Sequence, residues 1–270
     1  MRGGRKYKNL LLLGSFFQFL RVPPLPVLSA LFFFVMRLNR FLASAGLGSR
    51  RSVEELITSG QVRINGRVVT DLATQVGPND AVKVGSRLLR TEQKITVLLN
   101  KPPGYVCTAS DELDRKTIFH LLPPNWPRLY HVGRLDKESE GLLLVTNDGD
   151  LSLALTHPRY KIEKEYEVLI DKPLSPKDRE KLLRGFHIMG GRAKAEQVEV
   201  IKPTHLRLTL TQGIKRQIRL MLYELGYEVE RLARVRLGHL RIGEMRPGEW
   251  RLLTGKEIAA LKVPAAIAGK

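Results

Sequence analysis

The sequence predicts an α+β fold of two domains: a small helix, helix, hairpin module over residues 36–90 and a larger, mixed, largely antiparallel domain over residues 95–261. In the small module, two segments with helical spacing of apolar residues precede an Asn-Gly turn. In the larger domain, strand-like apolar runs outnumber helical ones. The alternation of strands and helices that a doubly wound parallel sheet requires is absent. With 270 residues, the chain is long enough for a core in each unit.

The first 35 residues differ in character from the rest of the chain. Four basic residues among the first eight precede an apolar run at 10–20, and a second run at 27–35 follows a Pro-rich break. Neither run reaches the ~20 residues that a helix needs to span a bilayer, and no small-residue cleavage site stands out. We expect residues 1–35 to be an extension without a function; the alternative is an interfacial membrane anchor. A short Ala-rich tail, residues 262–270, ends the chain.

The small module is predicted from its apolar spacing and its turn residues. A helix that opens at Met36, where we expect translation to start, has apolar residues at i, i+3, i+4 and i+7 and closes at Gly46. Ser49 is placed to cap a second helix. Asn65-Gly66 then provides the type I′ turn of a tight hairpin, and residues 81–84 form a further short strand.

Arginines cluster on the two helices of this module. Arg37 and Arg40 lie opposite the apolar face of the first helix, and Arg50 and Arg51 lie in the first turn of the second. Cations in a first turn oppose the helix dipole, so a phosphate partner is a better reason for them than helix stability. The whole chain has 45 Lys and Arg against 27 Asp and Glu, a net charge of +18 that is typical of a nucleic-acid-binding protein. The alternative is a merely solvated basic face.

The stretch RLNRFLASAGLGSRRSVEELITSGQVRINGRVV resembles the S4 RNA-binding domain, an αL motif, from end to end. The resemblance implies that the four arginines line a phosphate-binding face. Phosphate contacts position a protein on RNA without specifying sequence, so we expect no base readout from this module.

The larger domain follows a linker at residues 91–94. Its first strand is an apolar run at 95–99, which ends before Pro102 and Pro103. Further strands are predicted at 141–145, 166–170, 198–201 and 206–210, and helices at 176–183 and 217–225.

The block HVGRLDKESEGLLLVTNDGD, residues 131–150, contains the strongest candidate for catalysis. Asp136 stands between a basic Gly-Arg-Leu turn and an apolar run, where a sheet edge can hold it rigidly, and Arg134 is close enough to steer phosphate. The block resembles the signature of the RsuA family of rRNA pseudouridine synthases, which includes the RluB, RluE and RluF branches. Ser139 replaces the usual Thr and retains its hydroxyl group. The resemblance implies that Asp136 is the catalytic nucleophile; outside such a block it would be an ordinary surface carboxylate.

Two further motifs resemble the same family. In EKEYEV, Lys164 and Tyr166 match a K-x-Y-x-V motif, which implies that Tyr166 contacts the target base and Lys164 the RNA. In TLTQGIKRQIRLMLYELGYEVERL, Arg219 stands where the family has the arginine that pairs with the nucleophile, and Arg216 is a further RNA contact. Many relatives have Arg where this chain has Leu220. Without the resemblance, Tyr166 is simply a good strand residue and the arginines form a solvated helix face.

The resemblance, over residues 36–261, implies isomerisation of one or a few uridines of ribosomal RNA to pseudouridine. GRLDKESEGL, QGIKRQIR, GYEVERL and GEWRLLT are most similar to the RluF branch, which implies a large-subunit uridine near the peptidyl transferase centre. The alternatives are a small-subunit uridine, a noncatalytic S4-type ribosome-assembly factor, and a glycosidase-like hydrolase using Glu138 or Glu140. The uridine must be flipped out or lie in an open loop, and Asp136 acts at C1′ or through a glycal.

Composition limits the cofactors and the compartment. Cys107 is the only cysteine and the six histidines lack metal-ligand spacing, so we expect no disulfide and no metal. The isomerisation has no redox step and needs no cofactor. We expect a cytoplasmic monomer that binds ribosomal RNA or a ribosomal subunit assembly intermediate and no membrane.

Overall fold

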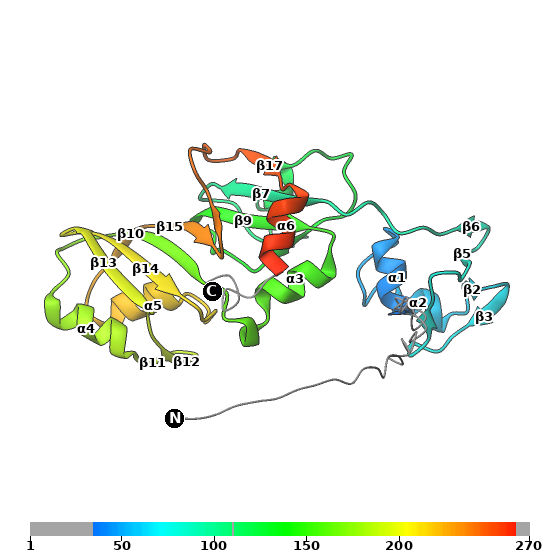
Figure 1. The fold of residues 1–270 in the computed structure, drawn as a ribbon, viewed down its shortest axis with the longest axis horizontal. Helices are drawn as coiled ribbons and strands as arrows, with labels where there is room; N and C mark the ends of the chain where they lie inside the picture. Colours follow the sequence, from blue (N-terminus) through cyan, green and yellow to red (C-terminus); the bar gives the residue numbers. More distant parts are fainter. Residues whose placement is uncertain (1–34, 110, 263–270) are drawn as a thin grey trace, which may run out of the picture.

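The computed structural model describes residues 35–109 and 111–262, and it shows a small domain beside a larger one (Figure 1). The α+β class with mostly antiparallel sheets is as predicted. Nearly all of the extension expected at 1–35 and of the tail expected at 262–270 lies outside the described residues.

The small domain has two helices, a two-stranded pair and a four-stranded sheet of order β3-β2-β5-β6. Its elements are β1 (Met36–Arg37), α1 (Leu38–Ser44), α2 (Glu54–Thr58), β2 (Val62–Ile64), β3 (Arg67–Val69), β4 (Gln75–Val76), β5 (Val82–Val84) and β6 (Arg87–Leu88). Asn65 and Gly66 both have positive φ, as the predicted type I′ turn requires. Leu38, Leu42 and Ile57 are fully buried in the core beneath the helices.

Both helices start later than predicted. Met36 and Arg37 form β1, which pairs with β4, so the first helix opens at Leu38. The second helix begins at Glu54, and Ser49 is not its cap. The Ser49 amide donates to Ser52 Oγ at 2.8 Å and the Ser52 amide to Ser49 Oγ at 3.1 Å, so these side chains close a turn that precedes the helix.

The larger domain is built on a nine-stranded sheet whose main order is β13-β14-β10-β15-β9-β7-β17. The strands are β7 (Thr96–Lys101), β8 (Tyr130–Val132), β9 (Glu140–Thr146), β10 (Lys164–Ile170), β13 (Gln197–Lys202), β14 (His205–Leu210), β15 (Val229–Leu237), β16 (Leu240–Arg241) and β17 (Trp250–Leu252), with a separate hairpin of β11 (Phe186–Ile188) and β12 (Gly191–Ala193). The helices are η1 (Ile118–Leu121), α3 (Gly149–Thr156), η2 (Pro158–Tyr160), α4 (Pro176–Arg184), α5 (Gln217–Glu224) and α6 (Gly255–Lys262).

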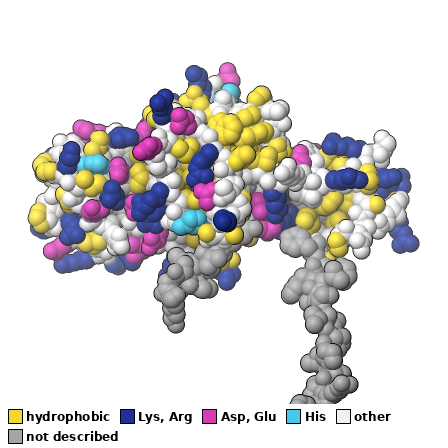
Figure 2. Space-filling model, turned by 45° about the horizontal axis from the view of Figure 1, so that its top comes forward, with side chains coloured by type: hydrophobic (Ala, Val, Ile, Leu, Met, Phe, Trp, Pro, Cys, Tyr) yellow, Lys and Arg dark blue, Asp and Glu magenta, His cyan; other side chains and the backbone are white. Residues whose placement is uncertain are grey.

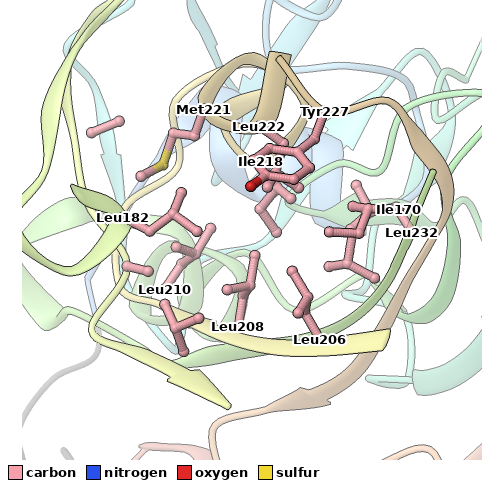
Figure 3. Close-up of a cluster of buried hydrophobic side chains, with 14 of the residues drawn as sticks. Ile170, Leu182, Leu206, Leu208, Leu210, Ile218, Met221, Leu222, Tyr227 and Leu232 are labelled. Carbon is pink, nitrogen blue, oxygen red and sulfur yellow. The ribbon is translucent and has the colours of Figure 1, made fainter. Parts of the chain in front are cut away.

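The sheet has two halves with separate cores. In one half, α4 and α5 pack on β10, β14 and β15, and Leu208, Leu210, Ile218 and Leu222 meet there (Figure 3). In the other half, α3 and α6 lie against β7 and β9 (Figure 1). Strand β7 is buried along its whole length and β9 along nearly all of it, because a second apolar cluster covers their other face.

The two halves meet where β9 and β15 run parallel, the one parallel pairing in this sheet among the described residues. It consists of two residue pairs, Ala233 with Glu140 and Arg234 with Gly141. Gly141 has φ +101°, and a Cβ at this position would lie 2.7 Å from the Arg234 amide nitrogen and still closer to its carbonyl oxygen. Only glycine allows the two strands to approach this closely.

Candidate active site

The three motifs of the larger domain converge on one cavity of about 760 Å³. The β8–β9 loop contributes Asp136 and Arg134, strand β10 contributes Lys164 and Tyr166, and the loop before α5 contributes Arg216. Arg134 and Arg216 are exposed, while Asp136, Lys164 and Tyr166 are partly buried. Segments far apart in the sequence therefore form one site at the seam between the two halves of the sheet.

Lys101 fixes the loop that holds Asp136. This lysine is fully buried at the end of β7, and its Nζ donates to the carbonyl oxygens of Ser139 at 2.6 Å and of Asp136 at 3.1 Å. It also reaches the carbonyl oxygens of Pro102 and Lys137. Burial lowers the pKa of Lys101, while nearby acidic groups oppose the shift. Lys101 was not predicted from the sequence; its signal there is a lysine at the end of a buried, mostly apolar strand.

Arg216, rather than Arg219, is the cation that faces Asp136. Arg216 Nη1 lies 3.9 Å from Asp136 Oδ2 and 3.5 Å from Glu138 Oε2. Arg216 has φ +57° at the N-terminal end of α5, a conformation that non-glycine residues rarely adopt. The Asp136 side chain is 29% exposed, so its carboxylate remains open to the cavity.

Arg219 does not form the ion pair expected from the sequence. Because α5 begins at Gln217, Arg219 lies in the first turn, and its Nη1 donates to the carbonyl oxygen of Val229 on β15 at 3.0 Å. Burial and the charge of Arg216 lower the pKa of Arg219, while Glu138 and Asp136 act in the opposite direction. Arg219 therefore lies behind Arg216, within electrostatic range of Asp136, and its catalytic role stays a prediction.

Tyr166 and Lys164 form part of the cavity wall. Tyr166 packs against the cores of both halves of the sheet. Lys164 Nζ donates to the carbonyl oxygens of Ile162 at 3.1 Å and Thr211 at 3.3 Å, and less closely to that of Gln212. Burial, together with the charge of Arg234, lowers the pKa of Lys164 to about 8. Lys164 thus ties the cavity wall together instead of reaching outward.

The structure separates the four arginines predicted to bind phosphate. Arg37 and Arg51 are exposed. Arg40 forms an ion pair with Asp150 in the first turn of α3, and Arg50 lies near Gly149 and the hydroxyl of Tyr130. Arg40 and Arg50 thus face the larger domain.

Further basic side chains on the small domain were not predicted. Lys and Arg gather over this domain on the face that Figure 2 shows, at the right. Exposed strand positions contribute Arg63, Arg67, Lys83 and Arg87. In the sequence, these four residues could have been recognised as basic residues at the outward-facing positions of short strands.

The described residues contain neither a membrane-spanning helix nor a metal-binding cluster. No helix within 35–109 and 111–262 is long and apolar enough to cross a bilayer. In the same residues, no group of three or more His, Cys, Asp or Glu side chains is arranged to hold a metal ion.

Comparison with known proteins gives two family matches and close relatives. Residues 36–82 match the S4 domain, and residues 95–224 match the RNA pseudouridylate synthase family. The Bacillus subtilis ribosomal large subunit pseudouridine synthase B is 36% identical over 85% of this chain and 96% of its own. The Escherichia coli K12 dual-specificity RNA pseudouridine synthase RluF is 37% identical over 84% of this chain and 78% of its own. An RNA pseudouridine synthase of Aquifex aeolicus is also 37% identical, over 84% of this chain and 93% of its own.

A solved structure agrees with these matches. A crystal structure of a pseudouridylate synthase has 30% sequence identity and a TM-score of 0.62, and the similarity covers 84% of this chain and 99% of that one.

Proposed function

The chain belongs to the RNA pseudouridylate synthase family, and on that premise we propose that it modifies a uridine of large-subunit ribosomal RNA near the peptidyl transferase centre, with Asp136 as nucleophile. The observation that carries the catalytic assignment is that Asp136 lines the same cavity as Tyr166, on a loop that Lys101 holds by hydrogen bonds. The names of the Bacillus subtilis and Escherichia coli relatives support a ribosomal target. Ribosomal RNA or an assembly intermediate is then the partner of a cytoplasmic monomer.

The reaction requires that the N1–C1′ bond of uridine breaks, that the uracil turns, and that its C5 bonds to C1′. In one route an Asp136 carboxylate oxygen displaces N1 at C1′ and forms an ester. In the other, Asp136 removes the C2′ proton as N1 leaves, which gives a glycal. Either route needs a free carboxylate close to a flipped-out nucleotide, and the cavity offers both the carboxylate and the space.

The remaining site residues receive roles from their positions. Tyr166 is placed to stack on the uracil, since aromatic stacking is a common way to hold an unpaired base. Arg216 supplies the counter-charge for Asp136, a role the sequence assigned to Arg219. Arg134, exposed at the rim of the cavity, is placed to bind a phosphate beside the target nucleotide. In this proposal residues 36–90 bind RNA and residues 95–261 carry out the reaction.

Asp136→Asn tests the assignment. The variant keeps the shape of the side chain but lacks the nucleophilic oxygen, so pseudouridine formation should fall to background. RNA affinity should survive, because it depends mainly on many Lys and Arg contacts to phosphate. The measurements are pseudouridine mapping in ribosomal RNA, RNA affinity and thermal melting on the same purified protein.

Glu138→Gln is the matched control, because Glu138 also faces Arg216 and lies two residues away. It should keep most of the activity, and a complete loss would favour the hydrolase-like alternative. Residual pseudouridine formation by folded Asp136→Asn would remove Asp136 from its role. Absence of pseudouridine with the wild-type protein would favour a noncatalytic assembly factor. Modification of small-subunit RNA would refute the proposed large-subunit target and leave the catalytic assignment intact.

A further inference from the structure

Arg234 on β15 is a buried arginine with no carboxylate partner among the described residues. Arg234 is only 3% exposed, and its Nε donates to the carbonyl oxygen of Leu142 at 2.7 Å. Its Nη2 is enclosed and has no hydrogen-bond partner. A buried guanidinium without a counter-ion is costly to the folded state. A charge kept at that cost indicates a function.

Arg236, two residues further along the same strand, shows how this protein treats an ordinary arginine. Arg236 donates to Glu165 at 3.0 Å and to Glu163 at 3.1 Å. Two acidic side chains therefore neutralise Arg236. None of the ion pairs formed by the described residues includes Arg234, although both arginines lie on one strand.

Arg234 lies on the wall of the catalytic cavity. It pairs directly with Tyr166 across the antiparallel β10 and β15, so the two side chains share one face of the sheet. Lys164, two residues from Tyr166 on β10, lies on that face too, and all three residues line the cavity. The charge of Arg234 contributes to the lowered pKa of Lys164, which places the two cations within electrostatic range of each other.

This wall is positive and lacks acids, whereas Asp136 and Glu138 face Arg216 on another side of the cavity. Lys164 already donates to three carbonyl oxygens, so it contributes charge only. Arg234 has no carboxylate partner among the described residues and lies beside Tyr166, the residue placed to hold the base, so its charge remains available on this wall. The ligand that fits is planar and anionic.

The proposed reaction forms such a species. When the N1–C1′ bond breaks, the electron pair stays on N1, and the uracil becomes an anion whose charge spreads to its two carbonyl oxygens. Later, C5 forms a bond to C1′. In the ester route the C1′–O bond breaks and its electron pair returns to the Asp136 carboxylate, and in the glycal route C2′ regains its proton. Finally, C5 loses its proton and N1 gains one. The base is therefore anionic between the two bond changes, whichever route Asp136 takes.

We propose that the positive charge of Arg234, on the cavity wall beside Tyr166, stabilises the departing uracil anion electrostatically, with Lys164 adding to the positive potential. This role rests on the proposed function of the cavity. A cation that is already oriented and desolvated stabilises developing charge far more than the same cation in water. The contribution falls on the bond-breaking step and not on RNA binding.

Arg234→Met, with a leaving-group comparison, tests the proposal. Single-turnover breakage of the N1–C1′ bond is measured with uridine and with 5-fluorouridine at the target position of the same RNA. Fluorine stabilises the departing anion by itself. The rate of bond breakage in Arg234→Met should therefore fall about 10²–10³-fold with uridine and clearly less with 5-fluorouridine. RNA affinity should stay within about twofold, and the melting temperature should not fall, since an unpaired buried charge is removed.

Arg236→Met is the matched control on the same strand. It breaks two ion pairs outside the cavity, so it should lower the melting temperature and affect both substrates equally. Arg234→Lys keeps a cation with fewer donors and should show a smaller leaving-group-dependent loss; it decides the question if Arg234→Met fails to fold.

An equal loss with both substrates, or no loss, in a folded Arg234 variant would overturn the role of Arg234 and leave the proposed function intact. A wild-type protein that forms no pseudouridine in RNA would overturn both, and it is recognised before any variant is made.

Discussion

Lys101 determines the position of Asp136 through the backbone and not through the carboxylate. Its ammonium group bonds to the carbonyl oxygens of Asp136 itself, of Lys137 and Ser139 in the same loop, and of Pro102. Lys101 is fully buried, so water does not replace it easily. The loop geometry therefore depends on a residue that does not line the cavity.

Lys101→Met should cost about 3 kcal/mol in the free energy of unfolding, because several buried acceptors lose their donor. The rate of pseudouridine formation should fall with little change in RNA affinity. Chemical denaturation and single-turnover kinetics measure the two effects. Lys172→Met is the control, since Lys172 lies over the ring of Tyr227 away from the site. Equal stability of the two variants would contradict the role of Lys101.

Lys164 makes stability depend on pH in a defined window. Its pKa of about 8 in the folded protein lies below the ordinary value of 10.5, so between these values the unfolded chain binds more protons. Stability of the wild type should therefore rise relative to Lys164→Met as the pH increases from about 8 to 10.5, by up to about 1.4 kcal/mol per pH unit. Denaturation curves at several pH values measure the difference. A constant difference across this window would contradict the lowered pKa.

Sequence patterns located some site residues and missed others for physical reasons. Asp136 and Tyr166 belong to motifs that resemble those of a known family, so the sequence alone predicts them as site residues. The choice between Arg216 and Arg219 depended on the residue at which α5 begins and on the left-handed backbone of Arg216. Arg234 was missed because its significance lies in the absence of a partner, which is a property of packing.

Among the elements, β15 shows why the sheet was only partly predicted. The buried runs that became β7 and β9 are continuous and apolar, which is typical of strands covered on both faces. Strand β15 has the sequence VERLARVRL, and its charged residues hide the alternation that marks a strand. Its arginines are accommodated by acids and carbonyl groups on neighbouring strands, which no local pattern records.

Gly141 is predicted to be indispensable for the β9–β15 pairing. Gly141→Ala adds a Cβ against the backbone of Arg234 at positive φ, so it should cost about 2–5 kcal/mol and reduce activity. Gly243→Ala is the control, because Gly243 also has positive φ but has no atom within 4 Å of the added Cβ. Its cost should be limited to about 1–2 kcal/mol. Thermal melting compares them, and similar losses would show that backbone strain alone explains the effect.

At the scale of the whole molecule, the contact between the domains uses charges that could otherwise meet RNA. Arg40 pairs with Asp150, and Lys94 in the linker pairs with Asp148 at 3.0 Å. Asp148 also caps α3, so both ion pairs join residues 36–94 to the N-terminal end of this helix. The sequence alone identified a basic face, but it could not show which of its arginines contact the larger domain and which remain free to bind RNA.

The double variant Arg37→Ala, Arg51→Ala is predicted to weaken RNA binding and its salt dependence. Both side chains are exposed, and each lost phosphate contact should lower the slope of log K against log salt by about 0.7 to 0.9. Arg40→Ala should change the slope less, because Arg40 already has a carboxylate partner. Titrations at several salt concentrations test this, with Arg184→Ala on α4 as control. An unchanged slope in the double variant would remove these arginines from the RNA interface.

The short parallel seam between β9 and β15 has a mechanical consequence for the candidate site. Asp136 belongs to one half of the sheet, and Tyr166, Arg216 and Arg234 belong to the other, and the backbone pairing between the halves consists of two residue pairs. A small rotation of one half against the other would change the distance between Asp136 and Tyr166 even if the interior of each half stayed intact. The stiffness of this backbone contact, which Gly141 makes possible, therefore sets the precision of the site.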